Sequence, residues 1–434
     1  MDLFSSEIRT VGISAGGHLS GDVTVSYVAE AEGDPTVQAY LDLWNSSMRK
    51  ETESRNRAAA LVMMSSRPVL ADIRTASGCV PGMKEHMLLH SGPPGQYVSF
   101  GETLKKALTA AVLYEGWTRS ETEAHRMLEN GEIELDSADC HNSSAVRCGV
   151  ISPSMPVLCV TDRNAGTYVY APAVRFFGDK GTGRPAAAAA SDAARCADIL
   201  VPALKDTLLE NGFIDIFSLA REGLRAGDDC CLRTDYSGSL LKDAVMGSMA
   251  DNGRQIKPEL FRYLGDGTLF LELFTAAVKA MLSSARNDDG CSFITSFCCS
   301  GNTAGIRIAG KSDIWFTVDL GKDTGCGDEA VCQLAGAGAP ALCCAPSLLE
   351  RMGLGLFDSL RMMYDSYEST DMYIEGLGIP LSGQPGSPLS IDFIKMCRTS
   401  CPLRMAYTDA ETPAVADLGM SMITAALKSF VSER

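Results

Sequence analysis

The chain has 434 residues, of which 46% are hydrophobic and 21% charged, so it is long enough for two or three globular domains. Its formal net charge of -16 argues against a nucleic-acid-binding protein, because such proteins concentrate lysine and arginine against phosphates. No stretch approaches the roughly twenty uninterrupted apolar residues of a membrane span, and the N-terminus lacks the basic-then-apolar order of a signal peptide. We therefore expect a cytoplasmic protein that binds neither nucleic acid nor membrane.

The sequence contains sixteen cysteines, which raises the question of disulfides or metal. In a cytosolic chain of this length we expect reduced, buried cysteines, because disulfide frameworks belong to short secreted domains. The adjacent pairs at 230–231, 298–299 and 343–344 are not CxxC motifs, and no two CxxC units have zinc-finger spacing. The pattern therefore indicates no metal and no other cofactor, with a thiol-based redox or metal protein as an alternative that rests on the cysteine count alone.

The first part of the chain alternates β-branched runs with helical periodicity. A loop with Gly16 and Gly17 joins the first two runs, but it does not make GxGxxG and is a weak pattern for a phosphate-binding loop. The arginine-proline pair at 67–68 ends the second helical pattern. The expected elements are strands at 7–13, 22–28 and 69–73 and helices from Thr36 and at 55–65, 104–114 and 120–129.

The segment 87–95 is the first candidate for a functional loop. An apolar run ends at His90, and the Ser-Gly-Pro-Pro-Gly sequence after it can continue neither a helix nor a strand. Such a loop can present a histidine and the amide of Gly92 to a ligand. Equally, it can be a proline-fixed connection whose histidine caps neighbouring carbonyls.

A second loop of small and polar residues, 140–155, precedes a strand predicted at 156–160. Arg147 and Ser152 are candidate ligands in this loop. A loop of small residues before a strand is also how a close approach of two backbones is built, so both interpretations stay open.

Composition changes after Asn164, where a glycine-rich linker leads into an alanine-rich helix and suggests a domain boundary near 178–186. Nearly every segment from there to residue 285 has helical periodicity. Within it, the adjacent Asp228 and Asp229 are expected to cap a helix in contact with solvent. The predicted fold is α+β and multi-domain, with mixed α/β domains and an inserted helical-bundle domain: an N-terminal α/β domain at 1–180, a helical domain at 187–285 and a C-terminal α+β domain at 286–434.

The stretch 286–310 predicts a β-hairpin with a turn at Gly301 and Asn302, because two strand-like runs at 292–298 and 304–308 flank a Gly-Asn pair. Arg286 and Asn287 precede it and Arg307 lies in its second strand. Fixed polar groups at the junction of a helix and a sheet commonly bind an anion or a carboxylate. An ordinary surface hairpin with solvated arginines is the competing interpretation.

The C-terminal part adds a strand at 314–318 and an acidic pair, Asp328 and Glu329, which is placed like a helix cap and first-turn acid. The small side chains of 336–345 suggest tight packing against another backbone. A final helix is expected from Thr412.

Short motifs recur in a fixed order along nearly the whole chain, and such an ordered set is more specific than any single motif. They are IRTVGI at 8–13, RPVLADI at 67–73, MLLHSGPP at 87–94, AVLYEGW at 111–117, ISPSMPV at 151–157, GTLFLELFTAAVKAM at 267–281, ARN at 285–287, GNTAGIRIAG at 301–310 and GDEA at 327–330. Together they resemble the YlbE/AllG-like family, formerly a domain of unknown function and since linked to oxamate carbamoyltransferase.

The resemblance implies a multi-domain α+β protein that is a subunit of a carbamoyltransferase assembly in anaerobic allantoin or purine nitrogen catabolism. In that assembly the family acts beside an FdrA-like subunit and a third small subunit, and a carbamate kinase uses the carbamoyl phosphate to make ATP. The small-molecule partners implied are carbamoyl phosphate and a small carboxylate or amide. Homo-oligomer formation stays open.

The sequence departs from the family pattern at two places. After Asp228 and Asp229 the family usually has Met-His and Arg-Asn, whereas this chain has Cys230, Cys231 and then Leu-Arg-Thr. The Gly-Pro-Met turn of the family is replaced around 143–149 by Ser-Ala-Val-Arg-Cys. The missing histidine motivates an alternative hypothesis, a non-catalytic scaffold or small-molecule-binding subunit whose Gly- and Ala-rich C-terminal surface docks a catalytic partner.

The leading hypothesis is transfer of a carbamoyl group between phosphate and an oxamate-like acceptor, performed within a complex. Carbamoyl phosphate is already activated, so cations and amide donors that hold its phosphate and polarise its carbonyl would lower the barrier most. We expect Arg286 and Arg307 to bind the anion, Asn287 to contact a carbonyl, and Asp328 to orient a cation. The candidate catalytic residues are His90, Arg286 and Asn287, and the candidate substrate-binding residues are Gly92, Arg307, Asn302, Gly305, Asp328 and Ser152.

Overall fold

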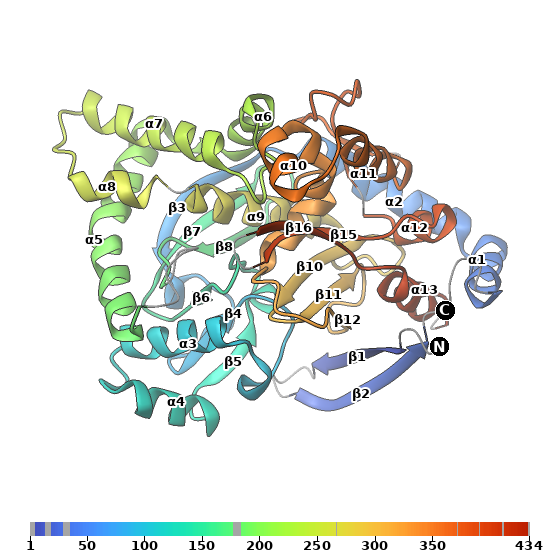
Figure 1. The fold of residues 1–434 in the computed structure, drawn as a ribbon, viewed down its shortest axis with the longest axis horizontal. Coiled ribbons are helices and arrows are strands. Elements are labelled where there is room, and N and C mark those ends of the chain that lie inside the picture. The colour runs from blue at the N-terminus through green and yellow to red at the C-terminus, as the bar shows by residue number, and fades with distance from the viewer. Residues whose placement is uncertain are drawn as a thin grey trace.

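The computed structural model describes the chain in eight segments: residues 5–13, 19–28, 35–176, 184–265, 267–370, 372–389, 391–409 and 412–432. The predicted loop with Gly16 and Gly17 and the glycine-rich stretch 178–183 of the predicted linker lie outside these segments. Figure 1 gives the arrangement of the elements, with the helices α5, α7 and α8 on one side and α1, α2, α12 and α13 on the other.

The strands form several small sheets instead of one large one. The first sheet is antiparallel in the order β8-β7-β3-β9, and the second has β4 parallel to β5 and antiparallel to β6. The third sheet, β10-β11-β12, contains the predicted hairpin. The strands of these sheets are β3 (Pro68–Thr75), β4 (Met87–His90), β5 (Glu134–Ser137), β6 (Val150–Ile151), β7 (Pro156–Asp162), β8 (Tyr168–Pro172), β9 (Ile214–Asp215), β10 (Ile294–Ser300), β11 (Thr303–Ile308) and β12 (Phe316–Asp319).

Three further pairs of strands are antiparallel ribbons, and the first of them, β1-β2, lies beside β12 in Figure 1. The six strands are β1 (Ser5–Ile13), β2 (Leu19–Val28), β13 (Tyr373–Ile374), β14 (Ser387–Pro388), β15 (Arg404–Asp409) and β16 (Thr412–Asp417).

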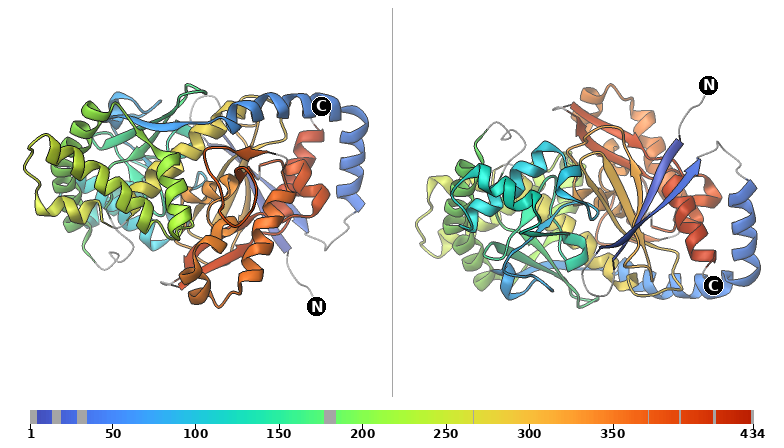
Figure 2. Two further views of the ribbon diagram at one scale, coloured as in Figure 1. Left: turned by 90° about the horizontal axis from the view of Figure 1, so that it is seen from above. Right: turned by 90° about the horizontal axis from the view of Figure 1, so that it is seen from below.

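Helices cover the sheets. In the views from above and below, α2 runs from α1, at the edge of the molecule, toward the middle (Figure 2). The helices are α1 (Pro35–Ser47), α2 (Arg49–Met64), α3 (Glu102–Tyr114), α4 (Glu121–Glu129), α5 (Ala186–Asn211), α6 (Ile216–Ala226), α7 (Asp235–Asp251), α8 (Pro258–Tyr263), α9 (Thr268–Leu282), α10 (Pro346–Met352), α11 (Leu356–Glu368), α12 (Phe393–Thr399) and α13 (Ser421–Ser432). Short 3-10 helices include η3 (Ala138–His141), η5 (Asp328–Ala335) and η6 (Ala339–Cys344).

Helix α9 is the central element of the fold. All 15 of its residues are buried. It contacts β3, β7 and β8 as well as η5 and β10, so it joins the first sheet to the third. A helix without a solvent face must satisfy its polar side chains inside the protein. The two charged residues of α9, Glu272 and Lys279, therefore mark where the polar interior lies.

By length and composition alone, the stretch Thr268–Ala285 could also cross a membrane, and in the described residues it is the one helical stretch that passes this test. However, 89% of that stretch is buried inside the protein. This burial is typical of a core helix.

The α+β fold class and the predicted hairpin are confirmed. Ser300 pairs with Thr303 across Gly301 and Asn302, and the backbone of Gly301 has a φ of 60°. A glycine with positive φ at the first central position suits a two-residue hairpin turn, because the twist of such a turn matches the twist of the strands. The asparagine does not share the left-handed conformation, so the glycine alone makes the turn possible.

Two predictions for the C-terminal part were wrong. The helix expected from Thr412 is the strand β16, and α13 starts only at Ser421. The Gly- and Ala-rich stretch does not form a docking surface, because its residues from Gly336 to Cys343 are buried. A Cβ atom on Gly336 would lie 2.7 Å from Cδ of Pro388, so this stretch packs closely inside the protein, as its small side chains indicated.

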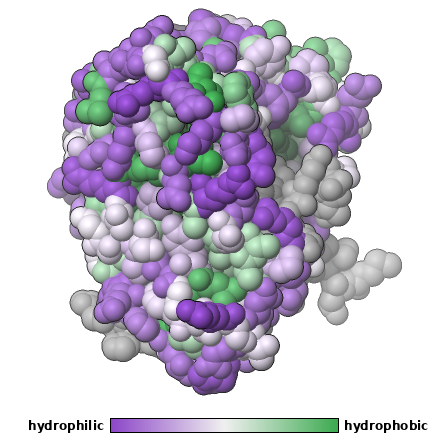
Figure 3. All heavy atoms as spheres, turned by 90° about the vertical axis from the view of Figure 1, so that its left-hand side faces the viewer, coloured by the Kyte–Doolittle hydropathy of each residue, from purple (hydrophilic) through white to green (hydrophobic). Residues whose placement is uncertain are grey.

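The division into domains at 180 and 286 stays a prediction. A single hydrophobic cluster includes Leu70 of β3, Leu204 of α5, Phe274 of α9 and Phe297 of β10, so the predicted segments share apolar contacts. The face formed by α5, α7 and α8 is mostly hydrophilic with small apolar patches (Figure 3). All sixteen cysteines are free thiols, and twelve of them are buried.

Candidate functional site

A group of charged side chains meets where η3, α9, β11 and η5 come together. We call Asp139, Lys279, Arg286, Arg307 and Asp328 the charge cluster. Their side chains are at most 12% exposed. Three cations face two carboxylates, which leaves an excess of one positive charge in a region with almost no water.

Lys279 occupies the centre of the charge cluster. Its Nζ atom lies 2.9 Å from Oδ1 of Asp139 and donates to Oδ2 of Asp328 at 2.8 Å and to the carbonyl of Ser143 at 3.1 Å. Burial opposes the charge on Lys279, but the two carboxylates outweigh it and raise the pKa of Lys279 above its ordinary value. The lysine therefore stays charged and holds η3 and η5 against α9.

The two arginines predicted to bind an anion converge on the same carboxylate. Nη2 of Arg307 lies 2.5 Å from Oδ2 of Asp139, and Nη2 of Arg286 lies 3.7 Å from Oδ1. Burial opposes ionisation of Asp139, but Arg307, Lys279 and Arg286 together hold its pKa well below the usual range. The carboxylate of Asp139 is therefore an internal anion that already pairs with the two arginines.

Each arginine still has hydrogen-bonding capacity. Nη1 of Arg286 donates to Oδ1 of Asn142 at 2.7 Å, and Nη1 of Arg307 donates to the carbonyl of Ser312 at 2.5 Å. The Nε atoms of both arginines are buried and have no hydrogen-bond partner within the described segments. A ligand that reached the cluster could accept from them.

The loop after His90 packs directly on the hairpin, so two separately predicted regions come together. The amide of Gly92 donates to Oδ1 of Asp328 at 2.8 Å, and the backbone of Gly92 has a φ of 92°. A Cβ atom on Gly92 would lie 2.4 Å from Cβ of Ser300. On the hairpin, a Cβ atom on Gly305 would lie 2.7 Å from Cγ of Pro93. Both glycines therefore allow the loop and the hairpin to touch.

His90 lies behind this contact and is fully buried. Its Nδ1 atom lies 2.9 Å from the carbonyl of Ser91. Since a carbonyl can only accept, Nδ1 donates, and Nε2 is the proton-accepting nitrogen. Nε2 has no hydrogen-bond partner in the part of the chain that the structure describes. Burial lowers the pKa of His90, so the ring is neutral.

Other predicted site residues lie elsewhere. Asn287 is exposed next to Arg286, and Asn142 instead makes the amide contact with that arginine. Asn302 donates to Asp319 at 2.9 Å in the exposed turn of the hairpin. Ser152 is buried, and its hydroxyl lacks a hydrogen-bond partner among the residues described.

The loop at 142–149 runs over the acidic residues of α9 and η5 and binds them through its backbone. The amide of Ala145 donates to Asp328 at 3.0 Å, that of Val146 to Glu272 at 3.2 Å, and that of Arg147 to Glu329 at 2.6 Å. Asp328 and Glu329 therefore lie in the first turn of η5, as predicted, but they hold another loop in place of capping their own helix. Carboxylates that accept from three successive amides fix this loop in the interior.

The sequence interpretation missed Asp139, Lys279 and Glu272. Glu272 and Lys279 had a recognisable signal, because a glutamate and a lysine seven residues apart lie about two turns apart on the same face of an otherwise apolar helix. Such residues are almost never fully buried unless they are paired. Asp139 had no comparable signal in a short, mixed segment.

The predicted solvent-exposed cap at residues 228–229 was wrong, because both aspartates are fully buried. Asp228 does cap α7, accepting from the amide of Ser237 at 2.8 Å. Asp229 accepts from the amides of Cys231 and Arg233 at 3.2 and 2.7 Å, and burial raises its pKa to about 6. This pair shapes a buried turn that contains the two cysteines.

One sizeable cavity adjoins the other end of α9. It has a volume of about 250 Å³ and lies between β8, α5, α8 and the first turns of α9. We call it the α9 cavity. Its lining includes Arg175, Arg184, Asp192, Arg262 and Glu272.

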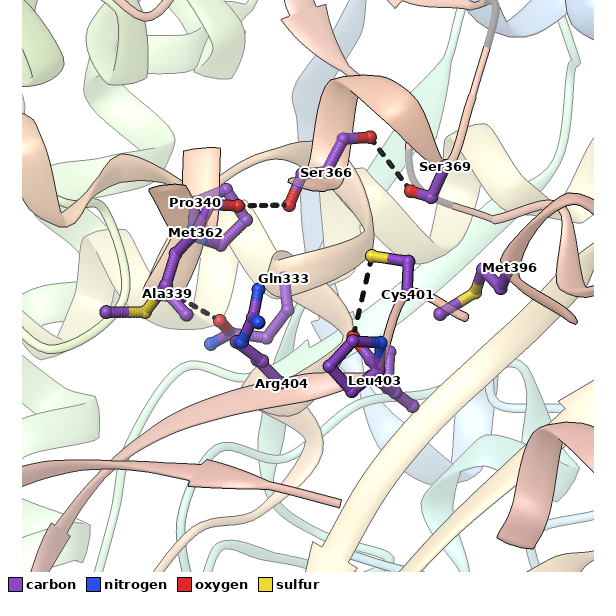
Figure 4. Close-up of a pocket in the computed structure, with 11 residues that line it drawn as sticks. Gln333, Ala339, Pro340, Met362, Ser366, Ser369, Met396, Cys401, Leu403 and Arg404 are labelled. Carbon is purple, nitrogen blue, oxygen red and sulfur yellow. Dashed lines mark hydrogen bonds between the residues drawn. The ribbon is translucent and has the colours of Figure 1, made fainter. Parts of the chain in front are cut away.

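A second cavity of about 20 Å³ lies between η5, η6, α11 and the segment before β15 (Figure 4). In it, Oε1 of Gln333 accepts from the amide of Ala339 at 2.7 Å, and Ser369 donates to the carbonyl of Ser366 at 2.9 Å. A cavity needs roughly 10–15 Å³ to hold one water. This one is therefore a water-sized space and no substrate pocket.

No group of three His, Cys, Asp or Glu side chains that could hold a metal ion occurs in the residues that the structure describes. The candidate chemistry therefore rests on the charge cluster and the α9 cavity.

Comparison with known proteins identifies relatives over most of the chain. Residues 133–330 match the sequence model of the family described as oxamate carbamoyltransferase subunit AllG. The oxamate carbamoyltransferase subunit AllG of Escherichia coli K12 is 28% identical over 407 residues, which cover 86% of this chain and 95% of that protein. The uncharacterized protein YahG of the same organism is 24% identical over 428 residues, covering 91% of this chain and 89% of that protein.

The fold also occurs in a solved structure. The crystal structure of a conserved protein of unknown function from Enterococcus faecalis V583 superimposes with a TM-score of 0.79 at 22% identity, covering 89% of this chain and 99% of that one. The matched region, 133–330, contains all five residues of the charge cluster and all five charged residues that line the α9 cavity.

Proposed function

We propose that the chain belongs to the AllG-like family and is a subunit of a carbamoyltransferase complex, because residues 133–330 match the family model and the AllG subunit of Escherichia coli is 28% identical over 86% of this chain. In the proposed reaction a carbamoyl group moves between phosphate and an oxamate-like acceptor. We further propose that the complex works in the cytoplasm in anaerobic allantoin or purine nitrogen catabolism. Its other members would be an FdrA-like subunit and a third small subunit.

The observation that carries a catalytic role is the excess positive charge of the charge cluster. Lys279, Arg286 and Arg307 gather around the carboxylates of Asp139 and Asp328. In a site with little water, such a charge stabilises an incoming phosphate or carboxylate more strongly than it would at the surface. The Nε atoms of the two arginines offer donors that are already held in place.

The other candidate residues take roles that follow from their positions. His90 is neutral, and its Nε2 atom can accept a proton or a hydrogen bond. Gly92 and Asp328 position the loop and Lys279. Ser152 offers a hydroxyl, and Asn287 would contact the acceptor carbonyl from the exposed side of Arg286.

Arg286→Ala tests this role with little risk to the fold, because Asp139 keeps its closer partners Lys279 and Arg307. With its partner subunits, the wild-type complex should release phosphate from carbamoyl phosphate only when oxamate is present. In the variant we expect a loss of roughly 100-fold or more, as for removal of a group that stabilises transition-state charge. Arg126→Gln on α4, far from the cluster, serves as the matched control. Unchanged phosphate release by Arg286→Ala would refute the assignment.

A non-catalytic subunit is the second candidate. It is favoured by one observation: the carboxylate of Asp139 already engages both arginines within the protein. Isothermal titration of the isolated chain with carbamoyl phosphate and with oxamate distinguishes the two candidates, since a pure scaffold would bind neither.

A further inference from the structure

The α9 cavity has the size of a pocket for a small metabolite. Pockets for drug-sized ligands begin at roughly 300 Å³, and a volume of about 250 Å³ is just below that range. The cavity is lined by apolar side chains from three elements and by a few charged groups, which is the usual composition of a ligand site. Its apolar walls include Phe176, Leu200 and Leu269.

Two charged groups in the lining are only loosely matched to each other. Nε of Arg175 lies 3.7 Å from Oε1 of Glu272, beyond hydrogen-bonding distance. The Nε and Nη1 atoms of Arg175 and Oε1 of Glu272 are buried without a hydrogen-bond partner in the described segments of the chain. Glu272 is only 1% exposed and Arg175 only 15%. Buried polar groups of this kind are costly unless a ligand or water completes them.

The more exposed side of the cavity carries two further arginines. Arg184 and Arg262 lie 3.4 and 2.7 Å from the carboxylate of Asp192, and their side chains are 48% and 61% exposed. Arg175 is therefore the one mostly buried cation among the residues that line the cavity. A ligand with a single negative charge would match it.

We propose that the α9 cavity binds a small carboxylate with a second hydrogen-bonding group on the adjacent carbon. The carboxylate would accept from the open N–H groups of Arg175. Because Oε1 of Glu272 lies 3.7 Å from Arg175, the second group of the same ligand would meet this oxygen. An amide or hydroxyl group at that position can donate to this oxygen and completes the pairing.

A phosphate group fits the cavity less well than a carboxylate. Phosphate esters carry between about one and a half and two negative charges near neutral pH, more than the single buried cation Arg175 would balance. The carboxyl group of Glu272 would lie next to those charges. The site is therefore distinct in chemistry from an anion site that holds phosphate.

Isothermal titration of the full chain with oxamate, acetate and inorganic phosphate tests the proposal. We expect oxamate to bind at one site, acetate to bind there more weakly because it lacks the second group, and phosphate, which the charge cluster would hold, not to displace oxamate. Arg175→Gln should weaken oxamate binding by roughly 10- to 100-fold, the loss of hydrogen bonds to a charged group. Arg126→Gln, an exposed arginine on α4, should bind like the wild type.

A second variant guards against a misfolded Arg175→Gln protein. Ala173→Leu places additional apolar volume in the lining without removing a charge, and it should also abolish oxamate binding while thermal unfolding stays cooperative. Oxamate binding that survives both changes, displacement of oxamate by phosphate, or no carboxylate binding by the wild type would each overturn the proposal.

The choice of oxamate as the probe rests on the proposed function, whereas the class of ligand follows from the cavity. Their failures are distinguishable. Carbamoyl transfer that persists in Arg175→Gln and Ala173→Leu would overturn the cavity as the acceptor site and leave the carbamoyltransferase assignment intact.

Discussion

The charge cluster and the α9 cavity share one helix and use it in opposite ways. Lys279 of α9 faces the cluster, where its ammonium group lies within 3 Å of two carboxylates. Glu272, two turns earlier, faces the cavity, where its nearest cation lies 3.7 Å away. Closely matched charges hold elements together, whereas loosely matched charges around empty volume leave donors and acceptors for a ligand. The comparison separates a polar interior that is largely paired, with the Nε atoms of Arg286 and Arg307 left open, from one whose charged pair is itself left open.

Lys279→Met should have the largest effect on stability, because it leaves Asp139 and Asp328 buried without the cation between them. Removing one partner of a buried ion pair costs about 3–5 kcal/mol. Urea unfolding monitored by circular dichroism should show a loss of this size. The matched control is Lys84→Met, which removes an ion pair of similar length, 2.8 Å to Glu134, from the surface. We expect a loss of less than about 1 kcal/mol there, and equal losses in the two variants would mean that the cluster is solvated.

Gly92→Ala should have the second-largest effect on stability, because it breaks the contact between the His90 loop and the hairpin. The left-handed φ costs about 1–2 kcal/mol for alanine, and the overlap with Ser300 adds a similar amount. Gly131→Ala has a similar positive φ, 69°, but nothing within 4 Å of the new Cβ atom. The Gly131→Ala variant should therefore lose only the free energy that the left-handed φ costs for alanine. The difference between the two free energies of unfolding measures how tightly the loop is packed, and no difference would contradict the packing described here.

The sequence predicted the elements around the charge cluster better than the cluster itself. The hairpin, the loop after His90 and α9 follow from local rules of turn chemistry and periodicity, so they could be placed without knowing the fold. Arg286, Arg307 and Asp328 were predicted as separate candidates, and no sequence pattern indicated that they lie together. Asp139, the common partner of the two arginines, could not be predicted, since tertiary contacts bring it in from 140 residues or more away.

The α9 cavity escaped prediction for a related reason. Arg175 follows a short strand and Glu272 lies in a core helix, and neither segment resembles a binding loop. Only the packing of α5 and α8 against α9 encloses the volume between them. By contrast, Asn287 is exposed and the half-buried Asn302 pairs with Asp319, so polar residues next to a turn need not point toward the site that the turn supports.

Glu272→Gln should separate the two regions by the pH dependence of stability. Burial raises the pKa of Glu272 well above its ordinary value, with Arg175 opposing and Glu329 and Asp328 adding to the rise. The folded protein then binds more protons at this site than the unfolded chain, so this group destabilises the wild type as pH rises above about 4.5, the ordinary pKa of glutamate. Asp139 has the opposite sign, because its lowered pKa makes its contribution disappear as pH falls.

Glutamine does not ionise, so Glu272→Gln removes the destabilisation by Glu272 and leaves the contribution of Asp139. Relative to the wild type, Glu272→Gln should therefore gain stability between pH 4.5 and pH 8 by more than the roughly 0.5 kcal/mol of an ordinary surface substitution. Free energies of unfolding measured at several pH values for both proteins give the difference directly. A difference that is constant with pH would mean that Glu272 is ionised in the folded protein at the same pH as in the unfolded chain.

Arg184→Gln should have the smallest effect and tests how open the α9 cavity is. The ion pair of Arg184 with Asp192 is 3.4 Å long and half exposed, and Asp192 keeps its shorter contact with Arg262. Exposed pairs of this kind contribute about 0–1 kcal/mol and weaken in salt. The loss in urea unfolding should therefore stay below about 1 kcal/mol and shrink further in 0.5 M sodium chloride. A loss as large as that of Lys279→Met would place Arg184 in an environment as dry as the charge cluster, and a small metabolite could then not enter from that side.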